Sequence, residues 1–333
     1  MDRAVATLTD VARLAGVGKA TASAVLNSSY ANTRVSQATR LRVISAAAQL
    51  RYQPNTVARS LSKRSTDILG FYQLNQRIRF GDPFVGDIMS GLQRGCRNNG
   101  KDLLMHIGSE RDSAAEHYAK LAGGMVDGLI LIADADNALA SMLADSHLPV
   151  VVLANPIDCL PGVAVEDADG MRQIAEYLAK RGHKRVLYRN EREMPTSGTR
   201  RYASFCVEAA RLGIAVEDSL SLGLPCSDDT TLVVQSRDEI ARFSAVVCWN
   251  DYDAHLVILR AESIGLRVPQ DLAVTGFDAF QTTARPAYHL TALRAPWEAV
   301  AETAIALLLR QIAGEKIPQE TLLPVRLVVG DTA

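Results

Sequence analysis

Residues 18–27 of this chain carry side chains suited to binding DNA. Lys19 can donate hydrogen bonds to guanine O6 and N7, a contact that distinguishes one base from the others in the major groove. The hydroxyls of Thr21 and Ser23 suit phosphates or base edges. The first chemistry that the sequence suggests is therefore recognition of a nucleic acid.

The elements that position these side chains form a helix-turn-helix pattern. Residues 8–15 predict a short helix with Thr9 as N-cap, and Gly16 separates it from a second helix over 18–27. In such a pair the second helix enters the DNA major groove. We expect the apolar face of the pair to contain Val11, Leu14, Ala15, Val17, Val25 and Leu26.

The charge of the chain is divided unevenly along its length. Residues 1–65 hold ten Lys or Arg against Asp2 and Asp10, a net charge of +8. Since the whole chain carries −1, residues 66–333 carry −9. A basic segment on an acidic body is the electrostatic pattern of a nucleic-acid-binding module, and a solvated basic face without a partner is the alternative.

Two further segments complete this basic head. A third helix is expected over 36–50, with Ser36 as N-cap. Residues 54–62 form a hinge that can open a short helix at Pro54, although a helix of this length is marginal alone. Residues 63–66 read as a linker. The apolar residues of the third helix are Leu41, Ile44 and Ala48, with Val43 lying off that line.

Composition and length restrict the remaining function classes. At 333 residues the chain suits two or three domains, and no apolar run reaches the roughly 18 residues that span a bilayer. The first residues lack the apolar core of a signal peptide, and the five cysteines are scattered without a Cys-x-x-Cys pair. We therefore expect a cytoplasmic protein without disulfides, zinc or membrane association.

Motifs of common enzymes do not match the chain. Residues 16–19 superficially suggest a phosphate loop, but no Ser or Thr follows Lys19 and the loop follows a helix. There is no Gly-x-Ser-x-Gly elbow and no His-Glu-x-x-His motif. The six histidines are scattered and read as surface or helix-end residues. The sequence therefore predicts neither an enzyme nor a cofactor or metal site.

From Asp67 onward, short apolar strands alternate with helices, which predicts parallel sheets with helices on both faces. Two successive sets of this kind predict two lobes with a cleft between them, where ligands bind beyond the carboxyl ends of the strands. The predicted strands cover 68–72, 103–107, 128–132, 149–153, 185–188, 245–249 and 272–275. The predicted helices cover 83–99, 112–123, 168–181, 200–212, 229–241 and 251–264.

Several motifs occur in an order and spacing that match one known family. The head carries Leu8-Thr9-Asp10-Val11-Ala12, Ala15-Gly16-Val17, Thr21-Ala22-Ser23, Val25-Leu26-Asn27 and Tyr52-x-Pro54-Asn55-x-x-Ala58-Arg59-Ser60-Leu61. The body carries Asp82-Pro83-Phe84, Val126-Asp127-Gly128-Leu129-Ile130, Gly182-His183, Asn250-Asp251, Gly265-Leu266-Arg267-Val268-Pro269 and Gly276-Phe277-Asp278. The chain resembles the lac-repressor (LacI/GalR) family of bacterial transcription regulators over essentially its whole length.

The resemblance implies a repressor that binds a near-palindromic operator as a dimer. It implies a helix-turn-helix domain over 1–53, a hinge helix and linker over 54–65, and a two-lobed body over 66–333, similar to periplasmic sugar-binding proteins. One lobe would contain about 66–165 and 295–324, and the other about 166–294 and 325–333. The hinge would become helical on DNA and place Leu61 in the minor groove; packing of Leu61 on the body is the alternative.

The resemblance also assigns candidate residues that contact DNA. Lys19, Ala20 and Ala24 would face bases, and Thr21 and Ser23 would face phosphates or base edges. Because Ala24 has no hydrogen-bonding group, it would read at most a thymine methyl. The set implied by the matching motifs is Thr9, Lys19, Ala20, Thr21, Ser23, Ala24, Asn27, Asn55, Ala58 and Leu61.

In the body, Arg201, Asn250 and Asp278 align with positions where this family contacts its effector. A guanidinium, an amide and a carboxylate suit a sugar, a sugar acid or another polyol. Asp82 and Phe84 supply a further carboxylate and a stacking ring. The alternative for each is an inter-lobe or capping role. For Asp251 we expect helix capping rather than ligand contact.

The sequence departs from the family pattern in three places. Gly18, Ala22 and Ala24 replace the usual Ser, Val and Arg of the recognition helix, and the loop after Asn27 is about three residues longer. The usual Arg-x-x-Gly-aromatic signature reads Arg201-Tyr202-Ala203-Ser204-Phe205. A sugar-binding receptor without a regulatory role is the rival function, and the basic head argues against it.

Overall fold

The computed structural model describes residues 6–26, 35–55, 58, 60, 63, 65–73, 82–108, 111–134, 137–190, 194–222, 240–280 and 288–333. The chain forms two compact units, Met1–Thr66 and Asp67–Ala333. Within the described ranges, no helix combines the length and the apolar character needed to cross a bilayer.

The first unit packs α1 (Leu8–Ala15), α2 (Lys19–Leu26) and α3 (Gln37–Gln49) around a small core. Gly16, in the left-handed region at φ 65°, ends α1 and turns the chain toward α2, which confirms the helix-turn-helix prediction. Ser36 caps α3 as predicted. The buried apolar residues of the unit are Val11, Ala12, Ala15, Ala22, Val25, Val43, Ala46 and Ala47.

One detail of this unit differs from the sequence prediction, and a second does not follow from the apolar pattern. The N-cap of α1 is Thr7 rather than Thr9, because Thr7 and Asp10 exchange side-chain-to-backbone hydrogen bonds in a capping box. In the third helix, the apolar residues Leu41 and Ile44 are 61% and 49% exposed. Its buried residues are the smaller Val43, Ala46 and Ala47, since the short helices of the head lie close together.

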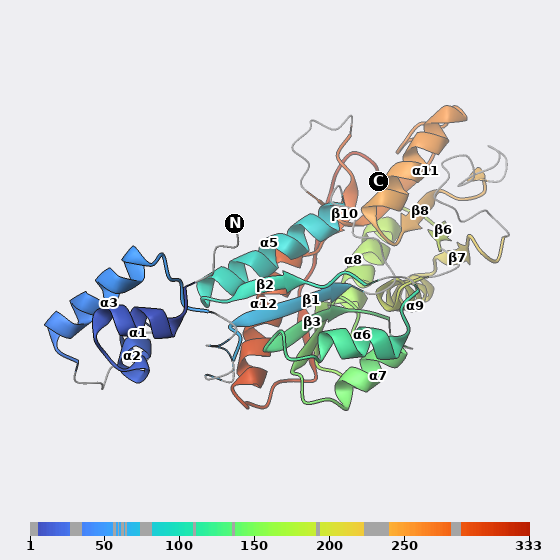
Figure 1. The fold of residues 1–333 in the computed structure, drawn as a ribbon. Helices are drawn as coiled ribbons and strands as arrows, with labels where there is room; N and C mark the ends of the chain where they lie inside the picture. The colour runs from blue at the N-terminus through green and yellow to red at the C-terminus, as the bar shows by residue number, and fades with distance from the viewer. Residues whose placement is uncertain are drawn as a thin grey trace. The chain divides into compact units, whose positions relative to one another are not determined.

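Among the described residues, the second unit contains two sheets of six strands each, built from alternating strands and helices (Figure 1). The first sheet has the order β11-β5-β4-β3-β1-β2, and every pairing is parallel. Its strands are β1 (Ile68–Gln73), β2 (Asp102–Met105), β3 (Gly128–Ile132), β4 (Val150–Leu153), β5 (Gly162–Val165) and β11 (Glu320–Leu323).

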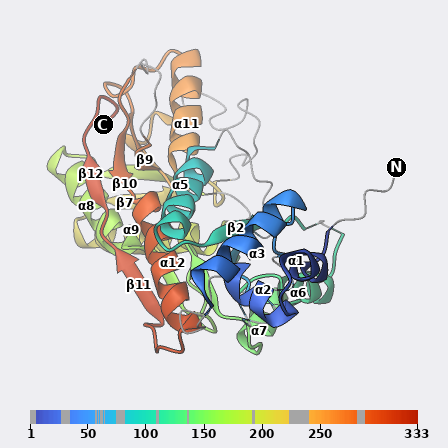
Figure 2. The same ribbon diagram turned by 60° about the vertical axis from the view of Figure 1, so that its left-hand side comes forward.

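Helices cover both faces of the first sheet. On one face α5 (Pro83–Asn98) and α12 (Trp297–Ile312) pack side by side (Figure 2). On the other face lie α6 (Ala114–Leu121) and α7 (Ala138–Ala144). This sheet and its four helices are called the first lobe below.

The second sheet has the order β12-β10-β9-β8-β6-β7, and only β12 runs antiparallel to its neighbour among the described strands. Its strands are β6 (Arg185–Arg189), β7 (Ala215–Asp218), β8 (Ala245–Cys248), β9 (Ala273–Asp278), β10 (Thr291–Arg294) and β12 (Arg326–Val328). We call this sheet and its helices the second lobe. Helices α8 (Asp167–Lys180) and α9 (Thr196–Arg211) cover one face, and α11 (Asp251–Ser263) covers the other.

The predicted alternation is confirmed, with differences at element ends. Helix α9 begins at Thr196, four residues before the predicted start, directly after Pro195. The strand predicted over 103–107 ends at Met105, and Ile107 is 85% exposed. The helix predicted over 229–241 falls outside the described residues, apart from 240 and 241.

Candidate functional site

The outward face of α2 carries most of the predicted DNA contacts. Ala22 and Val25 point into the head core, which leaves Lys19 and Ala20 exposed and Thr21 and Ser23 half-buried. Thr9 is exposed on α1. Lys19 and Ser23, four residues apart, therefore project from the same side of the helix, whereas Thr21 lies nearly opposite Lys19.

The prediction for Ala24 is not supported. Its side chain is 9% exposed, and a methyl group this buried offers almost no surface to a base. In the hinge, Asn55 is exposed and its Oδ1 accepts the N–H of Ala58 at 3.3 Å. Ala58 is itself exposed. The predicted contacts Asn27 and Leu61 lie outside the described residues.

In the body, the predicted effector residues Asp278 and Phe84 meet around Trp297, at the start of α12. The indole Nε1 of Trp297 donates to Asp278 Oδ1 at 2.8 Å. The Phe84 ring stands edge-on to the indole with centroids 4.9 Å apart. Phe84 is held by Asp82, which caps α5 by accepting the Phe84 N–H at 2.9 Å.

Arg201 is already engaged by residues of its own lobe. Its Nε donates to Asp167 Oδ1 at 2.9 Å and a terminal nitrogen donates to the Trp249 carbonyl at 2.8 Å. The guanidinium carbon lies 3.4 Å from the centroid of the Phe277 ring. The site therefore presents a fixed arginine that keeps only part of its donors for a ligand.

Asn250 has the capping role given as its alternative, and Asp251 does not cap α11 as expected. Asn250 is the N-cap of α11, and its Oδ1 accepts the Asp253 N–H at 2.8 Å. Asp251 is 6% exposed, and its Oδ2 accepts the Phe280 N–H at 3.1 Å. Asp251 therefore holds the turn after β9, where Asp278 and Ala279 have positive φ, and the capping role falls to Asn250.

Burial dominates the electrostatics of the two carboxyl groups. Burial raises the pKa of Asp278 to about 7, against the opposing effects of Arg201 and the Trp297 hydrogen bond, while Asp82 and Asp167 raise it further. Burial also raises the pKa of Asp251 well above its ordinary value, and the charge of Asp278 adds to that shift. Near neutral pH, both the protonated and the ionised forms of Asp278 are therefore populated, so its carboxyl group can donate as well as accept a hydrogen bond.

Arg294, at the end of β10, is a residue that sequence reasoning missed. Its side chain makes no hydrogen bond or ion pair with the part of the chain that the structure describes, and its Nε is buried. Its charge acts on Asp87 of α5 and on Asp251. Since Arg294 is in register with Asp278 on the neighbouring strand, a basic residue at this strand end was the available signal.

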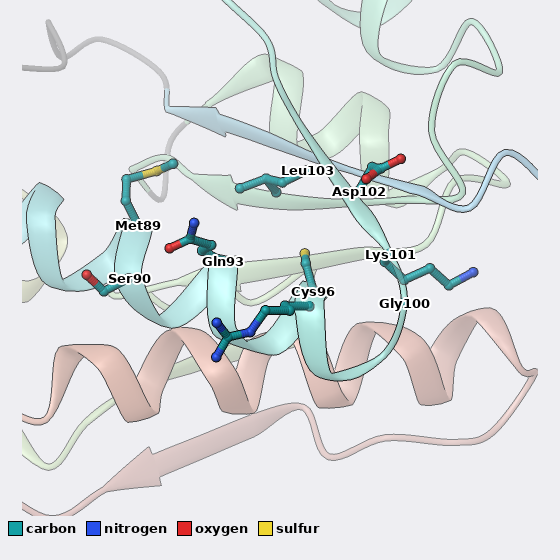
Figure 3. A pocket seen from close by; sticks show the side chains of 9 residues that line it. Met89, Ser90, Gln93, Cys96, Gly100, Lys101, Asp102 and Leu103 are labelled. Carbon is teal, nitrogen blue, oxygen red and sulfur yellow. The ribbon is translucent and has the colours of Figure 1, made fainter.

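A separate hollow of about 870 Å³ lies in the first lobe along α5 and the loop that leads to β2 (Figure 3). None of the predicted effector residues lines it. Its lining is Met89, Ser90, Gln93, Cys96, Arg97, Gly100, Lys101, Asp102 and Leu103. Among the described residues, no group of three or more His, Cys, Asp or Glu side chains could hold a metal ion.

Comparison with known families matches two segments of this chain. Residues 7–55 match the model of bacterial regulatory proteins of the lacI family, and residues 175–333 match a periplasmic binding protein-like domain. The HTH-type transcriptional regulator GalR of Escherichia coli (strain K12) is 30% identical, covering 95% of this chain and 92% of the relative. The HTH-type transcriptional repressor PurR of Aliivibrio fischeri (strain MJ11) is 30% identical, covering 92% of each chain.

Solved structures have the same fold. A lac repressor dimer bound to operator and the anti-inducer ONPF aligns with a TM-score of 0.80 at 24% identity, covering 99% of each chain. A complex of the transcriptional regulator CelR with cellobiose aligns with a TM-score of 0.64 at 26% identity, covering 98% of this chain and 100% of that one.

Proposed function

The chain belongs to the lacI family of bacterial transcription regulators, and we propose that it represses by binding a near-palindromic operator as a dimer under control of a small polar effector. The observation that carries the DNA-binding part is the outward face of α2. Its Lys19 is exposed beside Ala20, while the opposite face of the helix is buried in the head core. A helix that presents a lysine in this way fits the major groove.

We propose the domain division inferred from the sequence: a DNA-binding domain over 1–53, a hinge and linker over 54–65, and the two-lobed body over 66–333. The boundary between the two compact units, at Thr66 and Asp67, supports the end of the hinge. The positions of β11 in the first sheet and β12 in the second support a lobe boundary between 323 and 326.

The effector site is proposed between Asp278, Asn250 and Arg201 of the second lobe and Asp82 and Phe84 of the first. The half-buried Phe84 offers an aromatic ring to a sugar, Trp297 orients Asp278, and Asp278 offers a carboxyl group to the sugar hydroxyls. Arg294 adds a guanidinium without a partner among the described residues, which suits an effector with an acidic group. A sugar acid or a related polyol combines both kinds of group.

The dimer is supported by an exposed apolar stripe on α11. Tyr252 and Leu259 are 53% and 55% exposed and lie seven residues apart, so both project from the same side of the helix. A solved lac repressor of the same fold is a dimer, and a second copy of this chain is the partner proposed for this stripe. The relatives are named as regulators and not as enzymes; we propose the same here, in the cytoplasm where the chromosome lies.

Selection from a random duplex library with the full chain tests this proposal. Bound fragments are expected to converge on a near-palindrome, and a panel of sugars and sugar acids is then added to find the compound that changes binding. A rival receptor role without DNA regulation predicts stabilisation by a sugar with no enriched DNA sequence. That outcome would overturn the proposal of a transcription regulator but would leave the proposed effector site in place.

A further inference from the structure

Helix α9, which carries Arg201, begins without a cap of its own. Its N-cap residue is Pro195, which offers no side-chain acceptor. The first N–H groups of a helix have no partner within the helix and need acceptors from elsewhere. For α9, two of those acceptors come from the other lobe.

Two side chains of the first lobe accept these N–H groups. Asp134 follows β3, and its Oδ1 accepts the Thr196 N–H at 3.4 Å. Asn155 follows β4, and its Oδ1 accepts the Ser197 N–H at 3.2 Å. The Asn155 amide also donates to Asp134 Oδ1 at 3.3 Å, which fixes its own oxygen toward α9.

This contact is buried and is accompanied by a second one. Asn155 and Ser197 are 6% and 8% exposed, so water does not replace the cap while the lobes stay together. One turn further along α9, Arg200 lies 3.6 Å from Glu320 at the start of β11 in the first lobe. The first two turns of α9 are therefore held by three side chains of the opposite lobe.

We propose that Asp134 and Asn155 form an inter-lobe latch: they cap α9 only while the cleft is closed, and so hold Arg201 and Asp278 opposite Phe84 and Trp297. Separation of the lobes removes both acceptors at once and returns the N–H groups of α9 to water. The positive end of the helix dipole strengthens the bond to the Asp134 carboxylate. Asp134 and Asn155 are therefore positioning residues for the cleft rather than ligand contacts.

Trp297, one of the two tryptophans of the chain, reports on this closure without a label, because it is 2% exposed and bonded to Asp278 of the other lobe. Trp249 binds Arg201 through its carbonyl within the second lobe and supplies a background signal. Acrylamide quenching of tryptophan fluorescence in the full chain therefore measures the fraction of molecules whose lobes have separated. The experiment needs neither DNA nor effector, so its failure is distinguishable from failure of the proposed function.

Asn155→Ala is expected to raise the open-to-closed ratio about fivefold, the usual effect of losing one cap, and to increase quenching. Asn155→Asp keeps an acceptor and should quench like the unmutated protein. Asn137→Ala is the matched control. Asn137 caps α7 within the first lobe by accepting the Leu139 N–H at 2.9 Å, so its loss should leave quenching unchanged.

A second substitution separates a latch from ordinary helix capping. Pro195→Asp gives α9 a cap from its own lobe, and in the Asn155→Ala background it should restore the melting temperature but not the protection of tryptophan. If it restores both, Asn155 serves only the helix and the latch is wrong. Equal quenching in Asn155→Ala and Asn137→Ala would also overturn it. If Asn155→Ala does not fold, Asp134→Ala is measured by the same criteria.

Discussion

Trp297 and Asp278 join the two lobes through a hydrogen bond of 2.8 Å between the indole Nε1 and the carboxyl Oδ1. Both side chains are buried, and one begins α12 of the first lobe while the other ends β9 of the second. The carboxyl group therefore combines a role in joining the lobes with the raised pKa that its burial imposes.

The pKa of Asp278 predicts how stability depends on pH. Because the folded pKa is about 7 and the ordinary value is 3.8, the folded protein binds the extra proton between those values. Its contribution to the free energy of unfolding is fully present below pH 3.8 and is lost as the pH rises toward 7. Asp278→Asn keeps the acceptor for Trp297 and should raise the melting temperature most at pH 8 and less at pH 5. Calorimetry across this range measures it, and an equal gain at every pH contradicts the assignment.

The capping box of α1 predicts that two neighbouring threonines differ in their effects. Thr7→Ala removes the cap shared with Asp10 and should increase hydrogen exchange of the α1 amides about fivefold. Thr9→Ala leaves exchange unchanged and weakens DNA binding, because Thr9 is exposed within the helix. Exchange mass spectrometry with a parallel mobility-shift titration gives both values. Faster exchange in Thr9→Ala would contradict the observed cap.

Lys19 should determine one base pair in each half-site. Lys19→Ala is expected to relax one guanine and to lower specific affinity about tenfold, since a well-placed lysine contributes about 1–3 kcal/mol of discrimination. Arg13→Ala is the control because it removes the same charge from α1 instead of α2. Arg13 is exposed, and a terminal nitrogen of its guanidinium lies 3.3 Å from Asp10 Oδ1. Operator selection with each variant should change the consensus only for Lys19→Ala. An unchanged consensus for Lys19→Ala would mean that α2 docks differently.

Arg294 should decide between acidic and neutral sugars. Arg294→Gln is expected to remove most of the thermal stabilisation by a sugar acid and little of that by its neutral counterpart, because only the acid gains a charged hydrogen bond. Arg326→Gln is the matched control, since Arg326 is exposed and lies in register with Arg294 on β12. Equal losses for both compounds, or for both variants, would exclude Arg294 as an anion contact.

Leu259 should contribute to self-association through α11. Leu259→Asp places a charge on the exposed stripe shared with Tyr252 and should shift the chain from dimer to monomer at micromolar concentration. Sedimentation velocity measures the change, with the far-ultraviolet spectrum as a check on folding. Val207→Asp, at a residue 68% exposed on α9, is a control expected to leave the dimer intact. A dimeric Leu259→Asp variant would place the interface elsewhere.

The sequence predicted those elements whose signal is local. The strand expected over 128–132 is β3 residue for residue, because five consecutive buried apolar residues can hardly be read otherwise. Ser36 was identifiable as a cap because its acceptor serves Thr39, three residues away. The same holds for the helix-turn-helix, where Gly16 marks the turn.

Residues whose partners lie far away in the sequence were not predictable in the same way. Asp167 binds Arg201 across 34 positions, and Asn155 binds Ser197 across 42. Which side of α3 is buried depends on how closely the head helices approach one another. The spacing of apolar residues in the sequence does not give that distance. The role of Asp251 was wrongly predicted as helix capping because the turn at Asp278 and Ala279, which Asp251 supports, is a tertiary feature.

The positions of β11 and β12 also constrain when this protein can fold during its synthesis. Strand β11 closes one edge of the first sheet beside β5, and strand β12 pairs with β10 in the second sheet. Only residues 324 and 325 separate β11 from β12. The first sheet is complete only after residue 323 has left the ribosome, and the second only after residue 328. The head has its own core within the first 66 residues and can fold as soon as it emerges, so a nascent chain carries a folded head well before both lobes close together in one late step.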